Sequence, residues 1–351
     1  MLAICPPRSN KLKEENMRWF FLSFVAILLF GGSAPAQDIN VPKPTGDLNI
    51  KIGETSGMSF SRLPSRVTDD RLRAKGWKIE TVGLKGIDLI AEAVSSGTVQ
   101  LARFQILDAL RAIEKGGRLT LLLEDRPDEF IMIARKGITK CSDLNGKRYG
   151  VQNIGAPYAL MSEKWMREKC GAKPTLLVIS GGENRIVALM NGQLDGTSVQ
   201  LSDWITLNSE RPNEFPILMK FAEELPGLLA GVLVANKPWL EKNTDVAVAY
   251  SAEVLLDNRR IASDPKPLEA AAMKYQTKDD LKVFPQTYQA YQRDLGGFRQ
   301  NGGLTAERLK GGIELYTGLG LVKPGLTVER VSTLSVLEGA LKIVGKVPGK
   351  P

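Results

Sequence analysis

The sequence predicts an α/β protein of two similar lobes, joined by hinge strands, each with a mostly parallel β-sheet flanked by helices. Strand-like and helix-like segments alternate along the chain, which is typical of parallel sheets with helical crossovers. The same order of segments occurs twice, about 95 residues apart. The chain has 351 residues, of which 43% are hydrophobic and 25% charged. This length suits two modest globular domains better than one.

The first 36 residues are predicted to be an N-terminal extension followed by a secretory signal peptide. Residues 19–30 (WFFLSFVAILLF) form an apolar run, and the small-residue segment Ala34-Pro35-Ala36 follows it. The run is too short to cross a bilayer core, which needs roughly 20 residues. A buried core helix and an uncleaved anchor are the alternatives. We expect export to the periplasm and a mature chain beginning near Gln37, with Met1 or Met17 as the true start.

The first lobe is expected to begin with a strand at residues 48–52, where apolar and polar residues alternate. A small, polar loop follows at residues 53–59, and a second strand at residues 78–82. Apolar residues from Ile87 to Val94 then recur at helical spacing. Residues 99–102 restart as a strand.

The second lobe is expected to repeat this order. A strand at residues 147–152 leads into a small-residue loop at residues 153–156. Pro157 suits the first position of the next helix, where its missing N–H costs nothing. A buried strand at residues 176–179, a helical stripe and a closing strand at residues 193–197 complete the unit.

The spacing within the two units agrees. From Gly57 to Val82 is 25 residues, and from Gly155 to Ile179 is 24. Two such units favour two lobes, and one larger doubly wound sheet is the alternative. The apolar runs at residues 130–134 and 228–235 are the expected pair of hinge strands. The expected limits are 1–36 for the extension and signal, 37–135 for the first part of lobe 1, 136–228 for lobe 2, and 229–351 for the return hinge strand and the remaining helices of lobe 1.

Composition excludes several classes of function. The chain contains no histidine, which removes Ser-His-Asp and Cys-His catalysis and the commonest zinc ligand. It also lacks a G-x-x-x-x-G-K-[ST] phosphate loop and a G-x-S-x-G elbow. We therefore expect no catalytic residues, no metal and no cofactor. The net charge of +8 comes from scattered basic residues, so nucleic acid is not an expected partner.

The ligand site is expected where strands lead into helix N-termini, because ligands bind beyond the carboxyl ends of parallel strands. Unpaired N–H groups at those helix ends favour anions. The expected ligand-binding residues are Thr55, Ser56, Gly57, Met58, Ser59, Arg103, Phe104, Gln105, Asn153, Gly155, Ala156, Pro157, Arg185, Gln200 and Trp204. Arg103 adds a positive charge and predicts a small anion or a polar, planar molecule. The alternatives are tight turns for the glycines, a solvated position for Arg185, and core packing for Phe104 and Trp204.

Two cysteines remain beyond the predicted signal, Cys141 and Cys170. In an exported protein such a pair indicates a disulfide. Cys141 precedes the strand at residues 147–152, and Cys170 ends the helix after it, so both should lie at the same end of the lobe. Closing this loop would stabilise the fold by roughly 3–4 kcal/mol in the chain-entropy model. Two unpaired buried cysteines are the alternative.

Three segments resemble a known family: residues 50–55 (IKIGET), residues 138–151 (ITKCSDLNGKRYGV) and residues 188–196 (ALMNGQLDG). In them the chain resembles the periplasmic substrate-binding proteins of ABC importers. These type 2 periplasmic binding proteins include receptors for aliphatic sulfonates, taurine, nitrate and thiamine pyrimidines. Two positions depart from the family pattern: Gln100 replaces the usual aspartate, and residues 103–105 are bulkier than usual.

The resemblance implies an exported solute-binding protein that is not an enzyme. It would capture a small ligand between its lobes by hinge closure, and deliver it as a monomer to the membrane permease of an ABC importer. One alternative is a receptor for another importer class, or a sensor. Another is a precursor-synthase enzyme on the same fold.

Overall fold

The computed structural model describes residues 39–55, 57–225, 227–276 and 278–350. The predicted extension and signal peptide lie outside the described residues, so export stays a prediction. Within the described ranges, no helix has the length and apolar character needed to cross a membrane.

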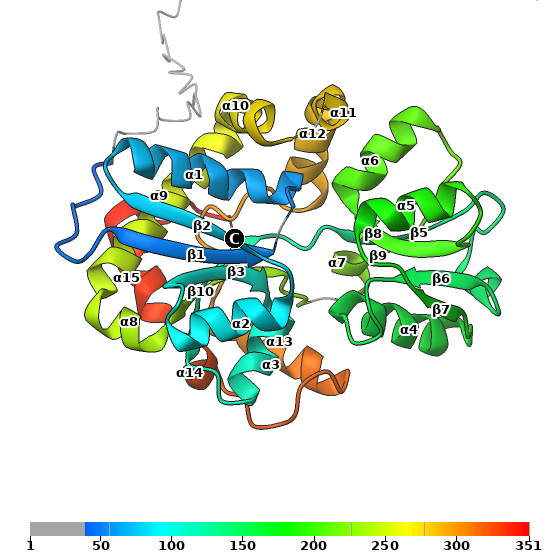
Figure 1. Ribbon diagram of the computed structural model, residues 1–351, viewed down its shortest axis with the longest axis horizontal. Coiled ribbons are helices and arrows are strands. Elements are labelled where there is room, and N and C mark those ends of the chain that lie inside the picture. Colours follow the sequence, from blue (N-terminus) through cyan, green and yellow to red (C-terminus); the bar gives the residue numbers. More distant parts are fainter. Residues whose placement is uncertain (1–38, 56, 226, 277, 351) are drawn as a thin grey trace, which may run out of the picture. The chain divides into compact units, whose positions relative to one another are not determined.

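The first β-sheet has the strand order β2-β1-β3-β10-β4 (Figure 1). Its strands are β1 (Asn49–Thr55), β2 (Lys78–Leu84), β3 (Leu101–Gln105), β4 (Leu119–Arg126) and β10 (Gly231–Asn236). β1 pairs in parallel with β2 and β3, whereas β10 is antiparallel to β3 and β4.

The second sheet repeats this plan with the order β7-β6-β8-β5-β9. Its strands are β5 (Phe130–Ala134), β6 (Arg148–Val151), β7 (Thr175–Val178), β8 (Gly196–Gln200) and β9 (Ile217–Lys220). β6 is parallel to β7 and β8, and β5 is antiparallel to β8 and β9. The predicted α/β fold of two similar units is confirmed.

Helices cover both faces of each sheet, and we call each sheet with its helices a lobe. The first lobe has α1 (Leu63–Ala74) on one face and α2 (Ile87–Ser96) and α3 (Ile106–Glu114) on the other (Figure 1). A short 3-10 turn, η1 (Phe60–Arg62), leads into α1, and a second, η2 (Cys141–Leu144), precedes β6. The second lobe has α4 (Pro157–Cys170), α5 (Gly182–Met190), α6 (Leu201–Glu210) and α7 (Phe221–Glu224). The C-terminal helices are α8 (Lys237–Lys242), α9 (Thr244–Ser263), α10 (Lys266–Tyr275), α11 (Lys278–Lys282), α12 (Phe284–Asp294), α13 (Ala306–Gly318), α14 (Val328–Val331) and α15 (Leu334–Val344).

Local sequence signals account for several of these elements. In β1, Ile50 and Ile52 are buried while Lys51 is exposed, as its alternating pattern predicts. α2 ends at Gly97, whose φ of 85° lies in the left-handed region that glycine adopts at helix ends. Pro157 occupies the first position of α4, where no N–H is needed.

The two expected hinge strands do not pair with one another. β5 lies inside the second sheet, and β10 lies inside the first. Both runs are apolar because each is a strand buried within its own sheet. The chain instead crosses between the sheets at residues 127–129 and returns through residues 221–230.

The C-terminal helices do not all pack on the first lobe. α9 and α15 pack together, and α15 contacts β4 of the first sheet. α12, however, contacts α6, and its Ala290 belongs to the same apolar cluster as Leu201 and Leu207 of the second lobe. The lobe limits expected from the sequence stay a proposal.

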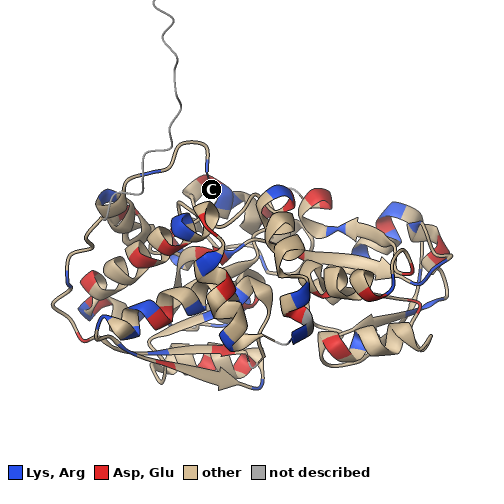
Figure 2. Cartoon of the chain, turned by 90° about the horizontal axis from the view of Figure 1, so that it is seen from above, with Lys and Arg blue, Asp and Glu red and all other residues tan. Residues whose placement is uncertain are grey.

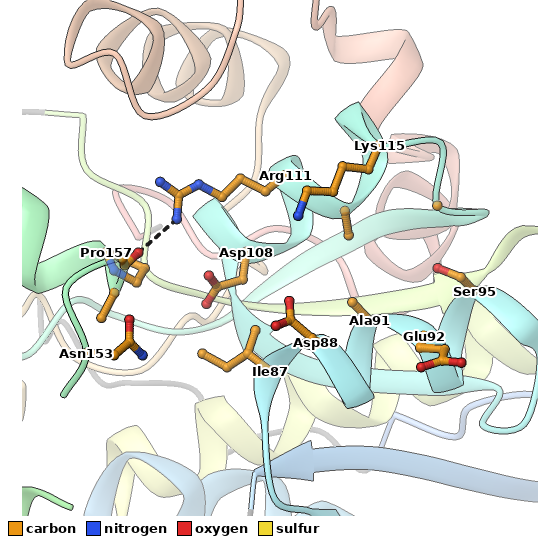
Figure 3. Close-up of a pocket in the computed structure, with 14 residues that line it drawn as sticks. Ile87, Asp88, Ala91, Glu92, Ser95, Asp108, Arg111, Lys115, Asn153 and Pro157 are labelled. Atoms are coloured by element: carbon orange, nitrogen blue, oxygen red, sulfur yellow. Dashed lines mark hydrogen bonds between the residues drawn. The ribbon is translucent and has the colours of Figure 1, made fainter. Parts of the chain in front are cut away.

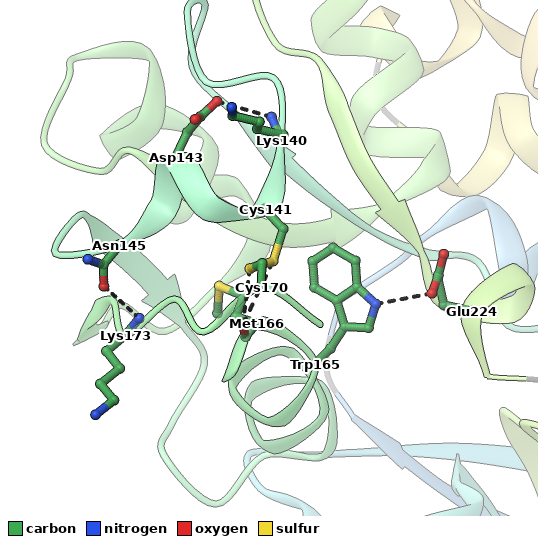
Figure 4. Close-up of a disulfide and its surroundings, with 9 residues drawn as sticks. All are labelled: Lys140, Cys141, Asp143, Asn145, Trp165, Met166, Cys170, Lys173 and Glu224. Carbon is green, nitrogen blue, oxygen red and sulfur yellow. Dashed lines mark hydrogen bonds between the residues drawn. A yellow bond between two sulfur atoms is a disulfide. The ribbon is translucent and has the colours of Figure 1, made fainter. Parts of the chain in front are cut away.

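Cys141 and Cys170 form a disulfide, with their Cα atoms 6.0 Å apart (Figure 4). Cys141 opens η2 and Cys170 closes α4. The same end of the lobe carries a hydrogen bond from the Lys173 backbone N–H to Asn145 Oδ1, 3.0 Å long. The covalent bond therefore ties the segment that precedes β6 to the last turn of α4.

Candidate functional site

A cavity of about 760 Å³, here called the main cavity, is lined by residues of both lobes. Its walls lie where β1 and β3 of the first sheet, and β6 and β8 of the second, lead into helices. These are the carboxyl ends of parallel strands, at which open α/β sheets bind ligands. The volume is within the range of sites for small molecules.

Most of the residues expected at the ligand site line this cavity. They are Thr55, Gly57, Met58, Ser59, Phe104, Gln105, Asn153, Ala156, Pro157, Arg185 and Gln200. Ser56 lies outside the described residues. The loops after β1, β3, β6 and β8 are thus gathered around one space by the duplicated topology.

A second cavity of about 470 Å³, here called the side cavity, adjoins the main one (Figure 3). It lies between α2 and α3 of the first lobe and the loop after β6 in the second lobe. Gly155, expected at the ligand site, lines this side cavity. Both cavities share the lining residues Ile87, Asp88, Asp108, Asn153, Ala156 and Pro157.

Arg103 does not line either cavity, which corrects the sequence-based expectation. Its side chain is 4% exposed, and its Nη2 lies 2.9 Å from Asp69 Oδ1 of α1. It also donates to the hydroxyl of Tyr250 of α9 and lies 3.6 Å from Glu54. Successive residues of a strand face opposite sides of the sheet, so Arg103 points toward α1 and α9 while Phe104 reaches the main cavity. The main support for an anionic ligand is therefore lost.

Trp204 also lies outside the cavity lining. Its indole Nε1–H donates to the backbone oxygen of Phe215 over 2.8 Å. The ring packs against the second apolar cluster, beside Leu201 and Leu207. Trp204 is a core aromatic, which the sequence alone could not distinguish from a cleft residue.

Arg185 does line the main cavity, and its guanidinium has only neutral partners. It donates to Gln152 Oε1 at 2.9 Å, to Thr197 Oγ1 at 3.2 Å and to the carbonyl oxygens of Gly181, Ile179 and Ser198. Burial lowers the pKa of Arg185. Its charge is thus held at the wall of the cavity without an ion pair among the described residues.

Arg62 is a second such cation, and sequence reasoning missed it. Its Nη1 donates to the carbonyl oxygens of Thr55 at 2.6 Å and Gly57 at 2.9 Å, so it holds the loop after β1. Burial, with a smaller effect from Arg126, lowers the pKa of Arg62 to about 10. The available signal was an arginine placed directly after the small polar loop, at the start of the following helix.

The charged lining is balanced between the two signs. The basic residues are Arg62, Lys85, Arg126 and Arg185, and the acidic residues are Asp88, Asp108, Glu183 and Asp203. Burial raises the pKa of both Asp108 and Asp203 to about 7. Figure 2 likewise shows Lys and Arg interspersed with Asp and Glu along the described elements. The cavity therefore suits a polar molecule with both donors and acceptors better than a simple anion.

An aromatic pair adds an apolar surface to the same cavity. Phe130 and Tyr158 are stacked, with ring centroids 3.8 Å apart and an interplanar angle of 17°. The Tyr158 hydroxyl donates to Asp128 Oδ1 over 2.5 Å. Because such rings offer a broad apolar contact, this part of the wall suits a planar or apolar group of the ligand.

Residues 127–129, the first of the two links between the sheets, carry two buried carboxyl groups beside this aromatic pair. Asp128 accepts from Tyr158, and Glu129 accepts from Gln200 Nε2 at 2.6 Å and from the hydroxyl of Tyr291. Burial raises the pKa of Asp128 to about 7 and also raises that of Glu129. Donors from β8, α4 and α12 therefore hold the link at residues 128 and 129.

Comparisons with known proteins agree with this architecture. A family model described as "NMT1/THI5 like" matches residues 75–254. Curated proteins yield no match. Among solved structures, the ligand-binding component of an ABC-type import system from Staphylococcus aureus has 17% identity and a TM-score of 0.66, over 83% of this chain and 98% of that chain.

Two further structures share the fold. The periplasmic nitrate-binding protein NrtA from Synechocystis PCC 6803 has 9% identity and a TM-score of 0.66, over 87% of this chain and 90% of that chain. The periplasmic aliphatic sulphonate binding protein SsuA from Escherichia coli has 14% identity and a TM-score of 0.58, over 82% and 92%. At these identities the likeness concerns the fold.

Proposed function

The chain belongs to the NMT1/THI5-like family, and from this premise we propose that it is an exported solute-binding protein that serves an ABC importer. The observation that carries the proposal is the main cavity, whose walls come from equivalent loops of two lobes. A site divided between two lobes is completed only when both contact the ligand. Binding is therefore coupled to closure of the lobes about the two chain segments that connect the sheets, as in periplasmic binding proteins.

The ligand that fits this lining is small and polar, with donor and acceptor groups. Arg62 and Arg185 offer donors, Asp108 and Asp203 offer acceptors, and the aromatic pair of Phe130 and Tyr158 offers a planar surface. The named structural neighbours bind sulfonate and nitrate. Unlike those anions, the ligand proposed here carries N–H or O–H groups as well.

We propose binding without chemical conversion. The chain has no histidine, and its two cysteines beyond residue 36 are joined to each other. The closed form would deliver the solute to a membrane permease. Continuous turnover of a bound solute by the purified protein would instead support a synthase on this fold.

Native mass spectrometry and small-angle X-ray scattering test the proposal together. The protein is incubated with ethanesulfonate, taurine, nitrate and 4-amino-5-hydroxymethyl-2-methylpyrimidine, each separately. We expect at least one of them, or a molecule retained from the source organism, to bind one per chain. That molecule should also reduce the radius of gyration. Binding without any change in scattering would contradict closure of the lobes.

A further inference from the structure

We propose that Asp108 is a ligand-binding residue that selects solutes carrying an N–H or O–H donor, at the junction of the main and side cavities. The inference rests on the proposed solute-binding function and names a residue that determines its specificity. Asp108 lies in the first turn of α3 and lines both cavities. Figure 3 shows its carboxyl group directed toward the loop that carries Asn153 and Pro157.

The carboxyl group of Asp108 is buried, and its Oδ2 has no hydrogen-bond partner among the described residues. The residue is 9% exposed, and its Oδ2 accepts no hydrogen bond within the described part of the chain. A buried polar atom without a partner costs about 1–3 kcal/mol, and more when it is charged. Folded proteins satisfy most such atoms, so an exception beside a cavity calls for a partner that comes from outside the chain.

The charged neighbours of Asp108 do not supply this partner. Arg111, one turn along α3, donates through Nη1 to Gly155 O at 3.1 Å (Figure 3). It also donates through Nε to Leu321 O at 3.0 Å. Burial is the largest cause of the raised pKa of Asp108; Arg111 attracts a negative charge there without a hydrogen bond, and Asp88 of α2 repels it. On α13, Tyr316 donates its hydroxyl to Leu229 O instead.

The other charged residues on the cavity walls also form no hydrogen bond or ion pair with Asp108 in the described part of the chain. Glu92 and Lys115 line the side cavity, and Lys85 and Arg126 line the main one, but none of them forms a hydrogen bond or ion pair with Asp108. The facing loop of the second lobe contributes Asn153, Gly155, Ala156 and Pro157. None of these four is charged.

Above its pKa of about 7, the Asp108 carboxylate accepts hydrogen bonds and donates none, so this ionised form discriminates by the donors of the solute. A charge-assisted hydrogen bond from an N–H or O–H group would satisfy the buried oxygen. A solute without a donor would leave that oxygen unpaired after closure. The resulting loss of affinity is about 10-fold or more, from the typical strength of a hydrogen bond to a charged group.

The test uses the whole protein and an ultrafiltrate of small molecules from cells of the source organism. Wild type, Asp108→Leu, Asp108→Asn and the control Glu314→Gln are each incubated with the filtrate, and retained molecules are identified by mass spectrometry. Glu314 lies on α13 with an exposed side chain, outside both cavities. Asp108→Leu removes the hydrogen-bond acceptor. Asp108→Asn keeps the shape of the side chain and removes its charge. The asparagine variant tests the proposal if the leucine variant does not fold.

We expect wild type and Glu314→Gln to retain the same solute, which carries an N–H or O–H group. Asp108→Leu should retain it at least about 10-fold less, in line with the strength of one such hydrogen bond, and Asp108→Asn, which keeps a neutral acceptor oxygen, should fall between wild type and Asp108→Leu. Equal retention by all folded variants, or a retained solute without any donor, would overturn the role of Asp108 and leave solute binding intact. Retention of nothing by wild type would overturn solute binding, and the inference with it.

Discussion

Arg103 and Arg185 show how differently two similar residues are used. In the sequence, Arg103 comes directly after a predicted strand and Arg185 follows the turn after another. Both arginines were therefore expected to contact the ligand. Arg103 is paired with Asp69 on the far side of the first sheet, whereas Arg185 lines the main cavity with neutral partners only. Arg103 has a structural role because its side chain points toward the Asp69 carboxylate. Arg185 can bind a ligand because its side chain points to the main cavity and has no carboxylate partner among the described residues.

We expect Arg103→Ala to lower the free energy of unfolding by about 3 kcal/mol, because buried Asp69 loses its closest cation and keeps only the Tyr250 hydroxyl and Arg66, 3.7 Å away, as partners. Urea denaturation at pH 7 measures the change. Lys310→Ala, which breaks an exposed pair with Glu314, is the control and should cost about 1 kcal/mol or less. A stable Arg103→Ala protein with weakened solute binding would restore the role first expected for this residue.

Asp108 and Asp203 should make the protein less stable as the pH rises. Their pKa values are raised by burial from 3.8 to about 7, so the folded form keeps protons that the unfolded chain loses. The free energy of unfolding should then fall between about pH 4 and pH 7 and level off above that. For one group the upper limit of this loss is roughly 4 kcal/mol, at 1.36 kcal/mol per pKa unit. Thermal unfolding from pH 4 to 9 should show a smaller decrease in Asp108→Asn and Asp203→Asn.

At the scale of elements, the disulfide between η2 and α4 is a local reinforcement. The bond closes a loop with a sequence separation of 29. Such a bond stabilises mainly by restricting the unfolded chain, typically by 2–4 kcal/mol. Neither cysteine lines the main or side cavity, so stability and binding should separate.

We expect Cys141→Ser/Cys170→Ser to lower the free energy of unfolding by about 2–4 kcal/mol. Reduction of the wild-type protein should have the same effect, and the double variant should not respond to the reductant. Affinity for a retained solute should stay unchanged. A large loss of affinity in the double variant would show instead that this bond positions the loop after β6.

At the scale of the whole molecule, Arg111 connects the two lobes by hydrogen bonds to a backbone carbonyl oxygen in each. Its guanidinium is anchored in the first lobe at Leu321 O and donates to Gly155 O of the second lobe. One such hydrogen bond contributes about 1 kcal/mol, which corresponds to about a 5-fold change between open and closed populations.

We expect Arg111→Ala to increase the radius of gyration of the solute-free protein in small-angle scattering, because it removes this contact. Arg330→Ala is the matched control, since the guanidinium of Arg330 donates to Gly325 O and Ile113 O within the first lobe. An identical scattering curve for Arg111→Ala and wild type would mean that this contact does not bias closure.

Local signals in the sequence determined the segments and their order. Alternation predicted β1, helical spacing predicted α2, and Pro157 marked the start of α4. Because parallel strands place their carboxyl ends at one edge, the order of segments also indicated the loops that line the main cavity. These features depend on residues close together in the chain, so the sequence alone could predict them.

The tertiary structure alone decided the partners of buried groups. Arg103 contacts Tyr250, which is 147 residues away, and α12 packs on α6 of the other lobe. The apolar runs of β5 and β10 show that each strand is buried, without showing which sheet buries it. Burial and pairing depend on contacts between distant segments. The direction of Arg103 and the unpaired state of Asp108 therefore follow from how the helices pack on the sheets, and the local sequence pattern leaves both undetermined.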